Sequence, residues 1–461
     1  MTRTATAVAA VILVALAGVA CTPQQATQPS ATASTPTTPP PSNPPGPTDP
    51  ANPTGGTDTT SPIGPTGSTG STGGPMAAPT AGLTTPTARS STVPTADGLD
   101  RQLIAAAWKN DVPAARRLIA AGADVNAVDD TVQSTFLIAA SEGYLDLLEL
   151  TLQHGADVRS LDSYRGTALI RAAERGHASV VGRLLRAGTA VDHVNRLGWT
   201  ALHEAVLLGD GSPRYVDTVR LLVAAGADRH RSAERDGTTP LQGAKTRSQT
   251  AVVATLTTEP PSRANAPTAL LSAAEAGDAD RVAAALAAGA RLEHKDSQGR
   301  TALLLASLHD RVAAARLLVG LGADPDAQDE RQDSAWLVTG VTGSVAMLET
   351  LLPAKPDLKL RNRYGGISVI PASERGHVDY VRRVVKTGID VNHVNNLGWT
   401  ALLEAVILGK GTEPWQEIVR ILLAAGANPS LPDRDGVTPL RHATNHGHHQ
   451  IATILRTAGA R

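Results

Sequence analysis

Residues 162–194 read DSYRGTALIRAAERGHASVVGRLLRAGTAVDHV, and residues 296–328 read DSQGRTALLLASLHDRVAAARLLVGLGADPDAQ. Both stretches are 33 residues long, and residues 433–460 (DRDGVTPLRHATNHGHHQIATILRTAGA) follow the same pattern. In each of them an Asp, a Gly and a Thr precede a short apolar segment, a second Gly-His or similar pair interrupts it, and apolar pairs follow. A repeat of this length predicts a stack of supersecondary units, each of which buries its apolar faces against its neighbours.

The recurring residues predict two short helices in each unit. A Thr stands where its hydroxyl can accept a hydrogen bond from the first free N–H groups of a helix. Pro240 and Pro439 follow such a Thr at a first helical position, where the missing N–H costs nothing. A Gly is expected to end the first helix, and a Leu pair to form the buried face of the second. The Thr residues are Thr200, Thr239, Thr301 and Thr438, and the Gly residues are Gly143, Gly176, Gly277 and Gly376.

This pattern, repeated imperfectly some eleven times, resembles the ankyrin-repeat family. The resemblance implies an all-α fold: an ankyrin-repeat solenoid of helix-turn-helix units joined by β-hairpin loops. We count five units in a first array, residues 98–258, and six in a second array, residues 265–461. The linker at 259–264 lies within TTEPPSRANAP, which breaks helices. The first five units align with the last five at an offset of 200 residues. The sequence leaves open whether the two arrays form one continuous solenoid, and it favours two packed or hinged halves.

The N-terminus predicts export. Residues 1–20 combine Arg3 with an apolar run from Ala7 to Ala20, which suits a secretory signal and is short for a membrane-spanning helix. Cys21, the chain's one cysteine, follows directly. The segment resembles a bacterial lipoprotein signal peptide, which implies a lipid on Cys21 and a location on the extracytoplasmic face of the cell membrane. Gly18 departs from the Leu that this family prefers, and simple cleavage after Ala20 is the alternative.

Residues 21–97 are almost wholly Thr, Pro, Ser, Gly, Ala and Gln. Such a segment cannot bury enough apolar area to offset the entropy of ordering, so we expect a disordered tether between the membrane and the folded body.

Composition and motifs argue against several classes of function. The 42 Lys and Arg residues nearly balance the 43 Asp and Glu residues, without a basic run, so nucleic acid is not an expected partner. No nucleotide-binding loop or nucleophile elbow is present, and we predict neither catalytic residues nor a cofactor. His442 and His446 have a chelating spacing, but His448 is a repeat-pattern residue and a polar final unit suits a solenoid cap, so no metal site is predicted.

One stretch recurs far more faithfully than the rest. NRLGWTALHEAVLLG (195–209) and NNLGWTALLEAVILG (395–409) are identical at twelve of fifteen positions, although aromatic residues make up only 2% of the chain. In ankyrin domains, the hairpin tips and the exposed side of the first helix form a concave binding face. Carried onto this chain, the resemblance assigns partner binding to two equivalent sets of residues. They are Tyr164, His193, Asn195, Leu197 and Trp199 in the first copy, and Tyr364, His393, Asn395, Leu397 and Trp399 in the second.

Packing explains other apolar residues of these units. Both units carry a five-residue insertion between their helices, and packing beneath it, against Tyr215 or Trp415, is the favoured role of nearby apolar residues. Those residues are Leu207, Leu208, Ile407 and Leu408, and the alternative that the resemblance implies for them is a place on the binding face. Phe136 and Trp336 occupy a buried position of the repeat and are expected in the core. His193, Asn195, His393 and Asn395 are expected to offer polar donors at the rim of the binding face.

The sequence therefore predicts a non-enzymatic scaffold, exported and lipid-anchored, that binds a protein partner on its concave face. Membrane contact would occur through the anchor alone. An envelope-binding or structural protein that recognises glycan or peptidoglycan is the alternative, because several aromatic rings on one face would suit sugar stacking. An immunity role is neither supported nor excluded.

Overall fold

The computed structural model describes residues 96–461, which are entirely helices, turns and connecting loops apart from isolated bridges. The predicted signal peptide (1–20), Cys21 and the predicted tether up to residue 95 lie outside the described residues. Within 96–461, no helix is both long and apolar enough to cross a membrane.

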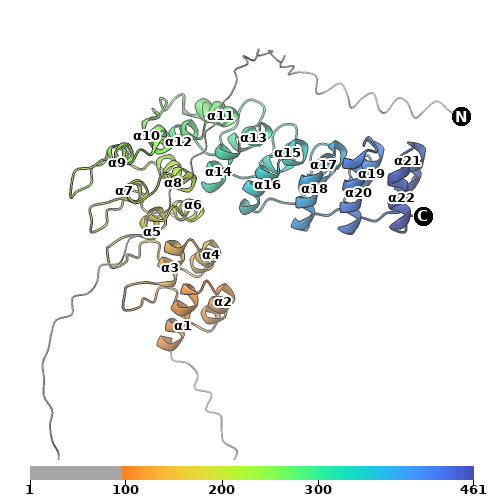
Figure 1. The fold of residues 1–461 in the computed structure, drawn as a ribbon. Helices are drawn as coiled ribbons and strands as arrows, with labels where there is room; N and C mark the ends of the chain where they lie inside the picture. Colours follow the sequence, from red (N-terminus) through yellow and green to blue (C-terminus); the bar gives the residue numbers. More distant parts are fainter. Residues whose placement is uncertain (1–95) are drawn as a thin grey trace, which may run out of the picture. The chain divides into compact units, whose positions relative to one another are not determined.

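Twenty-two α-helices form eleven consecutive pairs in the described part of the chain, which confirms the predicted stack of helix-turn-helix units (Figure 1). We number the units so that unit 1 holds α1 and α2, and unit 11 holds α21 and α22. Units 1–5 contain α1 (Ala96–Trp108), α2 (Val112–Ala120), α3 (Thr135–Glu142), α4 (Leu145–Gln153), α5 (Ala168–Glu174), α6 (Ala178–Arg186), α7 (Ala201–Leu207), α8 (Pro213–Ala224), α9 (Pro240–Thr246) and α10 (Thr250–Thr257).

Units 6–11 contain α11 (Ala266–Ala276), α12 (Ala279–Ala287), α13 (Ala302–Leu308), α14 (Val312–Gly320), α15 (Ala335–Thr342), α16 (Val345–Leu351), α17 (Val369–Arg375), α18 (Val378–Val384), α19 (Ala401–Ile407), α20 (Glu413–Ala424), α21 (Pro439–Asn445) and α22 (His449–Thr457). Two short 3-10 helices, η1 (Leu352–Ala354) and η2 (Val385–Thr387), extend α16 and α18.

Local chemistry places the helix ends where the sequence predicts them. Thr200, Thr239, Thr301 and Thr438 each accept a hydrogen bond from the backbone N–H three residues ahead, which satisfies a donor that the helix start leaves free. Gly143 and Gly277 end their helices with φ of 77° and 85°, a conformation that costs glycine little.

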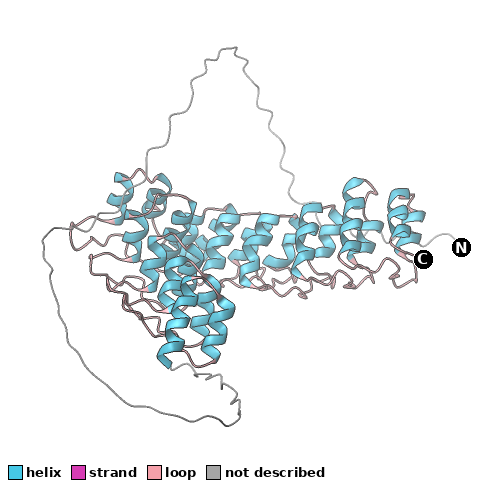
Figure 2. Cartoon of the chain, turned by 60° about the horizontal axis from the view of Figure 1, so that its bottom comes forward, coloured by secondary structure: helices cyan, strands magenta, loops and turns pink. Residues whose placement is uncertain are grey.

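The loops between units differ from regular hairpins. The described residues contain isolated bridges, such as Leu161 with Thr167 and Lys295 with Thr301, and no named strand (Figure 2). The arms are short, and most of their hydrogen bonds go to turn carbonyls or to an Asp or Asn side chain instead of a ladder. The loops are therefore tight turns, each pinned by one polar residue.

The core runs continuously through the stack of described units. Phe136 and Trp336 are fully buried, as predicted. Tyr380 is also fully buried, and its hydroxyl lies 2.7 Å from the hydroxyl of Thr339 on α15, the helix that carries Trp336. First helices pack on first helices along each array, for example α5 on α7 and α17 on α19.

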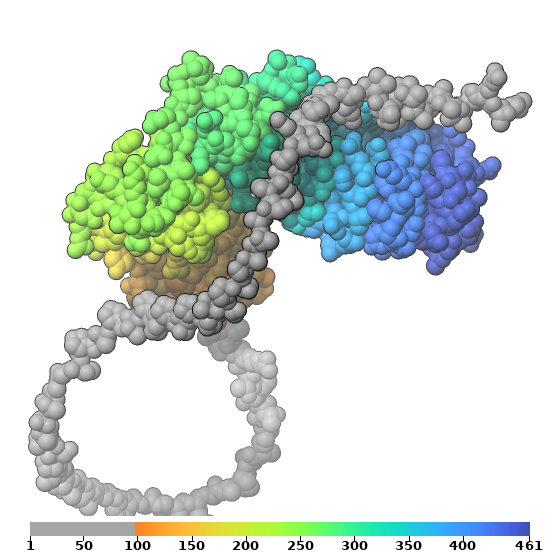
Figure 3. All heavy atoms as spheres, turned by 45° about the horizontal axis from the view of Figure 1, so that its top comes forward, coloured from red at the N-terminus to blue at the C-terminus, as the bar shows by residue number. Residues whose placement is uncertain are grey.

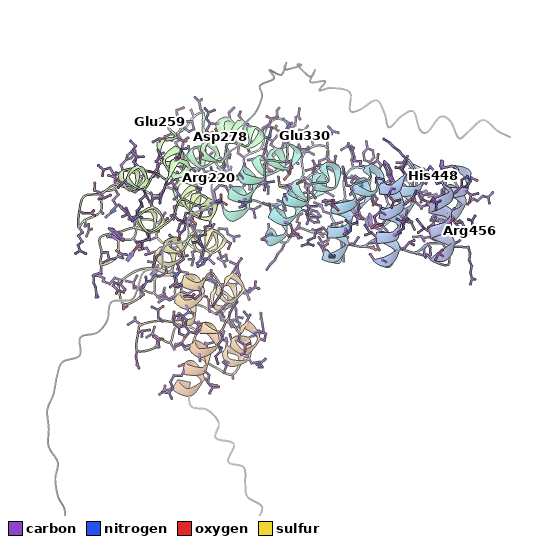
Figure 4. The ribbon with its side chains drawn as sticks, viewed as in Figure 1. Arg220, Glu259, Asp278, Glu330, His448 and Arg456 are labelled. Carbon is purple, nitrogen blue, oxygen red and sulfur yellow. The ribbon has the colours of Figure 1, made fainter. Side chains whose placement is uncertain are left out.

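The stacking of first helices changes between units 5 and 6. Here α11 packs on α12 and α13, while α12 packs against α8, and α14 against α6 and α8. Arg220 Nε on α8 donates to Asp280 at 2.7 Å, and Arg316 on α14 donates to Asp217 at 2.9 Å. The second helices of the two arrays are therefore docked on one another by ion pairs as well as by apolar contact. Figure 4 labels Arg220 on α8 and Asp278 at the start of α12, on the two sides of this junction.

The space-filling view shows the first array in orange to yellow-green and the second in green to blue (Figure 3). The two arrays thus meet through a packed junction and not through the peptide linker alone.

Candidate functional site

The predicted site residues of each copy lie on two adjacent loops that hydrogen bonds join. The N–H of Arg196 donates to the carbonyl of Tyr164 at 2.8 Å, and that of Asn396 to Tyr364 at 2.9 Å. The ring Nε2 of His193 lies 2.8 Å from the carbonyl oxygen of Arg165. In the second copy, His393 Nε2 lies 2.7 Å from the carbonyl oxygen of Gly365. The fold therefore brings Tyr164 beside residues 193–199, and Tyr364 beside residues 393–399.

The two tyrosines are the most accessible of the predicted residues. Tyr164 is 51% exposed and Tyr364 is 52% exposed. Arg171 lies over the first ring, 5.6 Å from its centre, and Arg363 over the second at 4.6 Å. Such cation–π contacts fix the ring while leaving its other face open.

Asn195 and Asn395 are buried, at 7% and 6% exposure, and the prediction that they offer donors at the rim is wrong. Asn195 Oδ1 accepts from the N–H groups of Leu197 and Trp199 at 3.0 and 3.1 Å. Its Nδ2 donates to Glu204 Oε1 at 2.8 Å. Asn395 makes the same three hydrogen bonds in the second copy. A buried amide must satisfy its polar atoms, so these residues hold the loop in place from within.

The histidines are also engaged inside the protein, because one nitrogen of each ring bonds to the neighbouring loop. Both rings are half-buried. Each histidine therefore links two loops through Nε2, and Nδ1 is the ring nitrogen that could contact a partner.

The remaining predicted residues of each copy, together with the exposed Leu208 or Leu408, form two equivalent groups. We call Tyr164, Leu197, Trp199 and Leu208 the first apolar set, and Tyr364, Leu397, Trp399 and Leu408 the second. Leu397 is 39% exposed, Leu197 is half-buried, and both tryptophans are half-buried. The indole Nε1 of Trp199 is enclosed without a hydrogen-bond partner, so that edge of the ring faces the protein.

Packing beneath the insertion is the role that the sequence favours for Leu207, Leu208, Ile407 and Leu408, but two of these residues are exposed, and Leu207 lies against Gly243 of the next unit. Leu207 is 9% exposed, and its methyl group occupies the space that a side chain at Gly243 would need. Leu208 and Leu408 are 48% and 37% exposed, so the packing expectation is wrong for these two. Each follows the last residue of a first helix, where the chain turns away before it can cover the side chain.

The insertion is held by its own aromatic residue. Tyr215 donates through its hydroxyl to the carbonyl of Glu174 at 3.0 Å, and Trp415 donates through Nε1 to the carbonyl of Glu374 at 2.9 Å. A side chain added at Gly209 or Gly409 would overlap these rings. The packing of these rings therefore explains why a glycine, Gly209 or Gly409, ends each copy of the duplicated stretch.

Buried carboxyl groups are a feature that the sequence interpretation missed. Glu204 and Glu404 are 3% and 5% exposed. Burial, followed by the charge of Glu174, raises the pKa of Glu204 to about 7. Burial, followed by the charge of Glu374, raises the pKa of Glu404 to about 8. Arg171 opposes the rise at Glu204, whereas the corresponding position in the second copy is a proline.

A sequence signal for these pairs exists. In four units the loop Asp or Asn bonds to the residue nine positions ahead on the first helix, and in these units the partners are chemically matched. The four pairs are Asp162 with Arg171, Asn195 with Glu204, Asn395 with Glu404, and Asp433 with His442. In these four pairs an Asp faces a cation and an Asn faces a carboxyl group, whereas the residue nine positions after Asp296 is Leu305 and the one after Asn362 is Pro371.

The histidine-rich end does not assemble a chelating group in the described part of the chain. His442 Nε2 lies 2.7 Å from Asp433 Oδ2, which orients this ring within its own unit. The rings of His442 and His446 are stacked, with centres 6.2 Å apart. No group of three His, Cys, Asp or Glu residues among 96–461 could hold a metal ion. Figure 4 labels His448 and Arg456 at this end of the stack.

Comparison with known proteins identifies the repeat. The family model for ankyrin repeats, which spans three copies, matches residues 103–193, 136–233, 248–329, 340–433 and 372–461. The putative ankyrin repeat protein YahD of Escherichia coli K12 is 42% identical over 197 residues, which are 42% of this chain and 98% of that protein.

Two solved structures are also similar. An ankyrin repeat domain of Acinetobacter baumannii AYE is 47% identical and covers 42% of this chain and 98% of its own, with a TM-score of 0.41. The ankyrin repeat protein EF0377 is 36% identical and covers 41% of this chain and 97% of its own, with a TM-score of 0.40. The family model matches well over half of the residues of this chain, and the chain therefore belongs to the ankyrin-repeat family.

Proposed function

We propose that this chain is a scaffold that binds a protein partner through the two apolar sets. Ankyrin-repeat domains are generally scaffolds for protein interactions and typically have no catalytic activity. One observation supports the assignment to these residues. Tyr164 and Tyr364, and Leu208 and Leu408, are large apolar side chains that are exposed at equivalent places in both arrays.

The fold explains the other residues that the two copies share. Asn195 and Glu204 bond to each other, the Thr caps a helix, and the Gly makes room for an aromatic ring. Exposed tyrosine and leucine contribute nothing comparable to folding, and such residues are typical of interaction sites. Their retention in both copies supports partner binding at each one.

Substitution of the exposed residues tests this proposal. Changing Tyr164, Tyr364, Leu208 and Leu408 to Ala should abolish capture of the partner by crosslinking in the native membranes. Because these side chains are exposed, the free energy of unfolding should change by about 0.5 kcal/mol or less per substitution. Trp108→Ala is a matched control, since Trp108 is 48% exposed but outside both sets. Undiminished capture by the fourfold variant would refute the assignment.

We also propose that the protein is exported and anchored by a lipid on Cys21, with residues 22–95 as a tether. The support is the sequence of the N-terminus: an apolar run of signal-peptide length ends at the chain's one cysteine. Several acyl chains on one residue would hold the protein stably at the membrane, which a single chain does not.

Cys21→Ser should move the protein from the membrane fraction to the soluble extracytoplasmic fraction, as measured by fractionation. Ala20→Ser, which leaves the cysteine in place, serves as the control. If the Cys21 variant stays in the membrane fraction, the anchor is not this residue.

A further inference from the structure

The loops that carry Tyr164 and Tyr364 also carry exposed cations. Arg159, Arg165 and Arg196 surround the first tyrosine in sequence and in the joined loops, and all three are exposed. None of them makes an ion pair or a side-chain hydrogen bond with another residue of 96–461. The side chain of a surface arginine in this state is available to a partner.

The second copy has the same charge on different positions. Lys359 and Arg361 are exposed and likewise make no ion pair within the described units. Arg363 lies over the Tyr364 ring and pairs with Asp333 at 3.0 Å. With Arg171, which lies over the Tyr164 ring, four cations accompany Tyr164 and three accompany Tyr364, and only positions 159 and 359 correspond at the offset of 200 residues.

The acidic groups of these loops are turned toward the backbone. Asp157 Oδ1 accepts from the N–H of Arg159 at 2.9 Å, and Asp357 Oδ1 accepts from the N–H of Lys359 at 2.9 Å. Asp162 is buried and pairs with Arg171. Asp157 and Asp357 are exposed, but the backbone engages one oxygen of each carboxylate, whereas the side chains of Arg159, Arg165 and Lys359 have no hydrogen-bond partner within 96–461.

The backbone conformation of Arg165 is one that the turns of several units adopt. Its φ is 57°, in the left-handed region that a residue with a side chain rarely adopts. Gly365 occupies the equivalent position in the second copy, with φ of 69°. Val132 and Gln332 stand at the same position of the turn in units 2 and 8, with φ of 62° and 59°, so this conformation belongs to the turn and not to Arg165 alone.

Exposed cations also occur on other turns, for example Arg235 in unit 5 and Arg434 in unit 11, but each of these stands beside an exposed acidic residue. The preceding unit of each array carries exposed acidic residues at its turn: Asp130 in unit 2 and Glu330 in unit 8. Figure 4 labels Glu330 beside the second array's loops. The turn of unit 2 is acidic, whereas Glu330 in unit 8 is followed by the exposed Arg331, so an oppositely charged neighbouring turn is present only in the first array.

We infer that the partner segment bound at each apolar set is acidic, with aromatic or aliphatic side chains that contact the tyrosine and leucines. This inference rests on the proposed function and adds the chemistry of the partner. The carboxylates of the segment pair with the cations of units 3 and 9, and its apolar side chains bury Tyr164 or Tyr364.

Synthetic polymers of known composition provide a direct test. Binding of a fluorescent random copolymer of glutamate and tyrosine to the full chain is measured by anisotropy, beside polyglutamate and a copolymer of lysine and tyrosine. The copolymer of glutamate and tyrosine should bind most tightly, and its affinity should fall as salt is added. A variant that combines five substitutions should bind the copolymer of glutamate and tyrosine about tenfold more weakly or worse. The substitutions are Arg159→Gln, Arg165→Gln, Arg196→Gln, Lys359→Gln and Arg361→Gln.

A control variant removes exposed cations elsewhere. This control combines Arg116→Gln, Arg117→Gln and Arg456→Gln. The three arginines lie on α2 and α22, at the two ends of the stack, so their loss should leave binding of the copolymer unchanged. Equal loss in this control would overturn the inference, because net charge alone would then explain it. Equal binding of the lysine copolymer, or of polyglutamate without tyrosine, would also overturn it.

Two further results separate this inference from the proposed function. If the cation variant still captures the native partner but the Tyr and Leu variant does not, the apolar sets bind a partner that is not acidic, and the inference fails alone. If neither variant affects capture, both fail. Vesicles of phosphatidylglycerol that bind through the same cations, while the copolymer does not, would assign the charge to a membrane surface instead.

Discussion

At the scale of single residues, the paired Asn and Glu of units 4 and 10 connect loop geometry to protonation. Asn195 holds its loop through Leu197 and Trp199 and donates to Glu204. A carboxyl group in this position is favoured in its neutral form because burial penalises the charge. The loop that presents Leu197 and Trp199 is therefore anchored on a group that titrates near neutral pH.

Glu404→Gln should stabilise the protein in the alkaline range. The pKa of Glu404 is raised from 4.5 to about 8, so folding is most favoured when the group is neutral and loses stability as the pH rises from about 4.5 through 8. Glutamine keeps the acceptor for Asn395 and carries no charge. Urea unfolding at pH 5, 7 and 9 should show a smaller fall in stability for the variant than for the wild type.

Glu204→Gln is the matched comparison. Its pKa is raised only to about 7, with Arg171 opposing the rise, so the affected range ends about one pH unit lower. An unchanged slope of stability against pH in Glu404→Gln would show that this carboxyl group is ionised at no cost in the folded protein.

At the scale of elements, the insertions of units 4 and 10 show how a longer loop is accommodated. The insertion leads into α8 and α20, which are 12 residues long, whereas most other helices have seven to nine. Trp415 is 8% exposed and lies against Gly376 and Gly409. The ring closes the space beneath the insertion and ties it to α17 through the carbonyl of Glu374.

Trp415→Ala should lower the free energy of unfolding by about 3 kcal/mol or more, because it leaves a cavity and an unpaired carbonyl. Thermal or urea unfolding measures the loss. Trp108→Ala, at an exposed tryptophan, should cost about 0.5 kcal/mol or less. Similar losses for the two variants would mean that the ring does not support the insertion.

At the scale of the whole folded chain, the junction between units 5 and 6 decides how the two arrays meet. A side chain at Gly182 on α6 would clash with the carbonyl of Gly320 on α14. Leu221 of α8 covers Gly320 from the other side. Two glycines thus allow the helices to approach closely, and the ion pairs Arg220–Asp280 and Arg316–Asp217 surround this contact.

Gly182→Val should separate the two arrays without unfolding them, because each array retains its own stack of helices. Small-angle X-ray scattering should then give a larger radius of gyration, while circular dichroism shows unchanged helix content. Ser179→Ala, an exposed position on the same helix, should change neither measurement. An unchanged radius of gyration in Gly182→Val would show that the junction tolerates the added side chain.

The repeat could be predicted from particular residues, because its signals act within one unit. Thr200 and Thr438 mark helix starts, Gly143 and Gly277 mark helix ends, and Phe136 and Trp336 fall at a buried position; each depends on neighbours a few residues away. The site was less predictable. The exposure of Leu208 and the burial of Asn195 follow from the position of the next helix and loop, which no local pattern contains.

The amino-acid sequence by itself determined the kind of unit, the number of units and the duplication, since capping, chain reversal and the 33-residue period are local properties. Only the tertiary structure decided the side chains left exposed, the carboxyl groups enclosed and the way in which the arrays meet. Burial of Glu404, and the docking of α12 on α8, depend on atoms brought together from distant parts of the chain. The energy of such contacts exists only once the units have stacked.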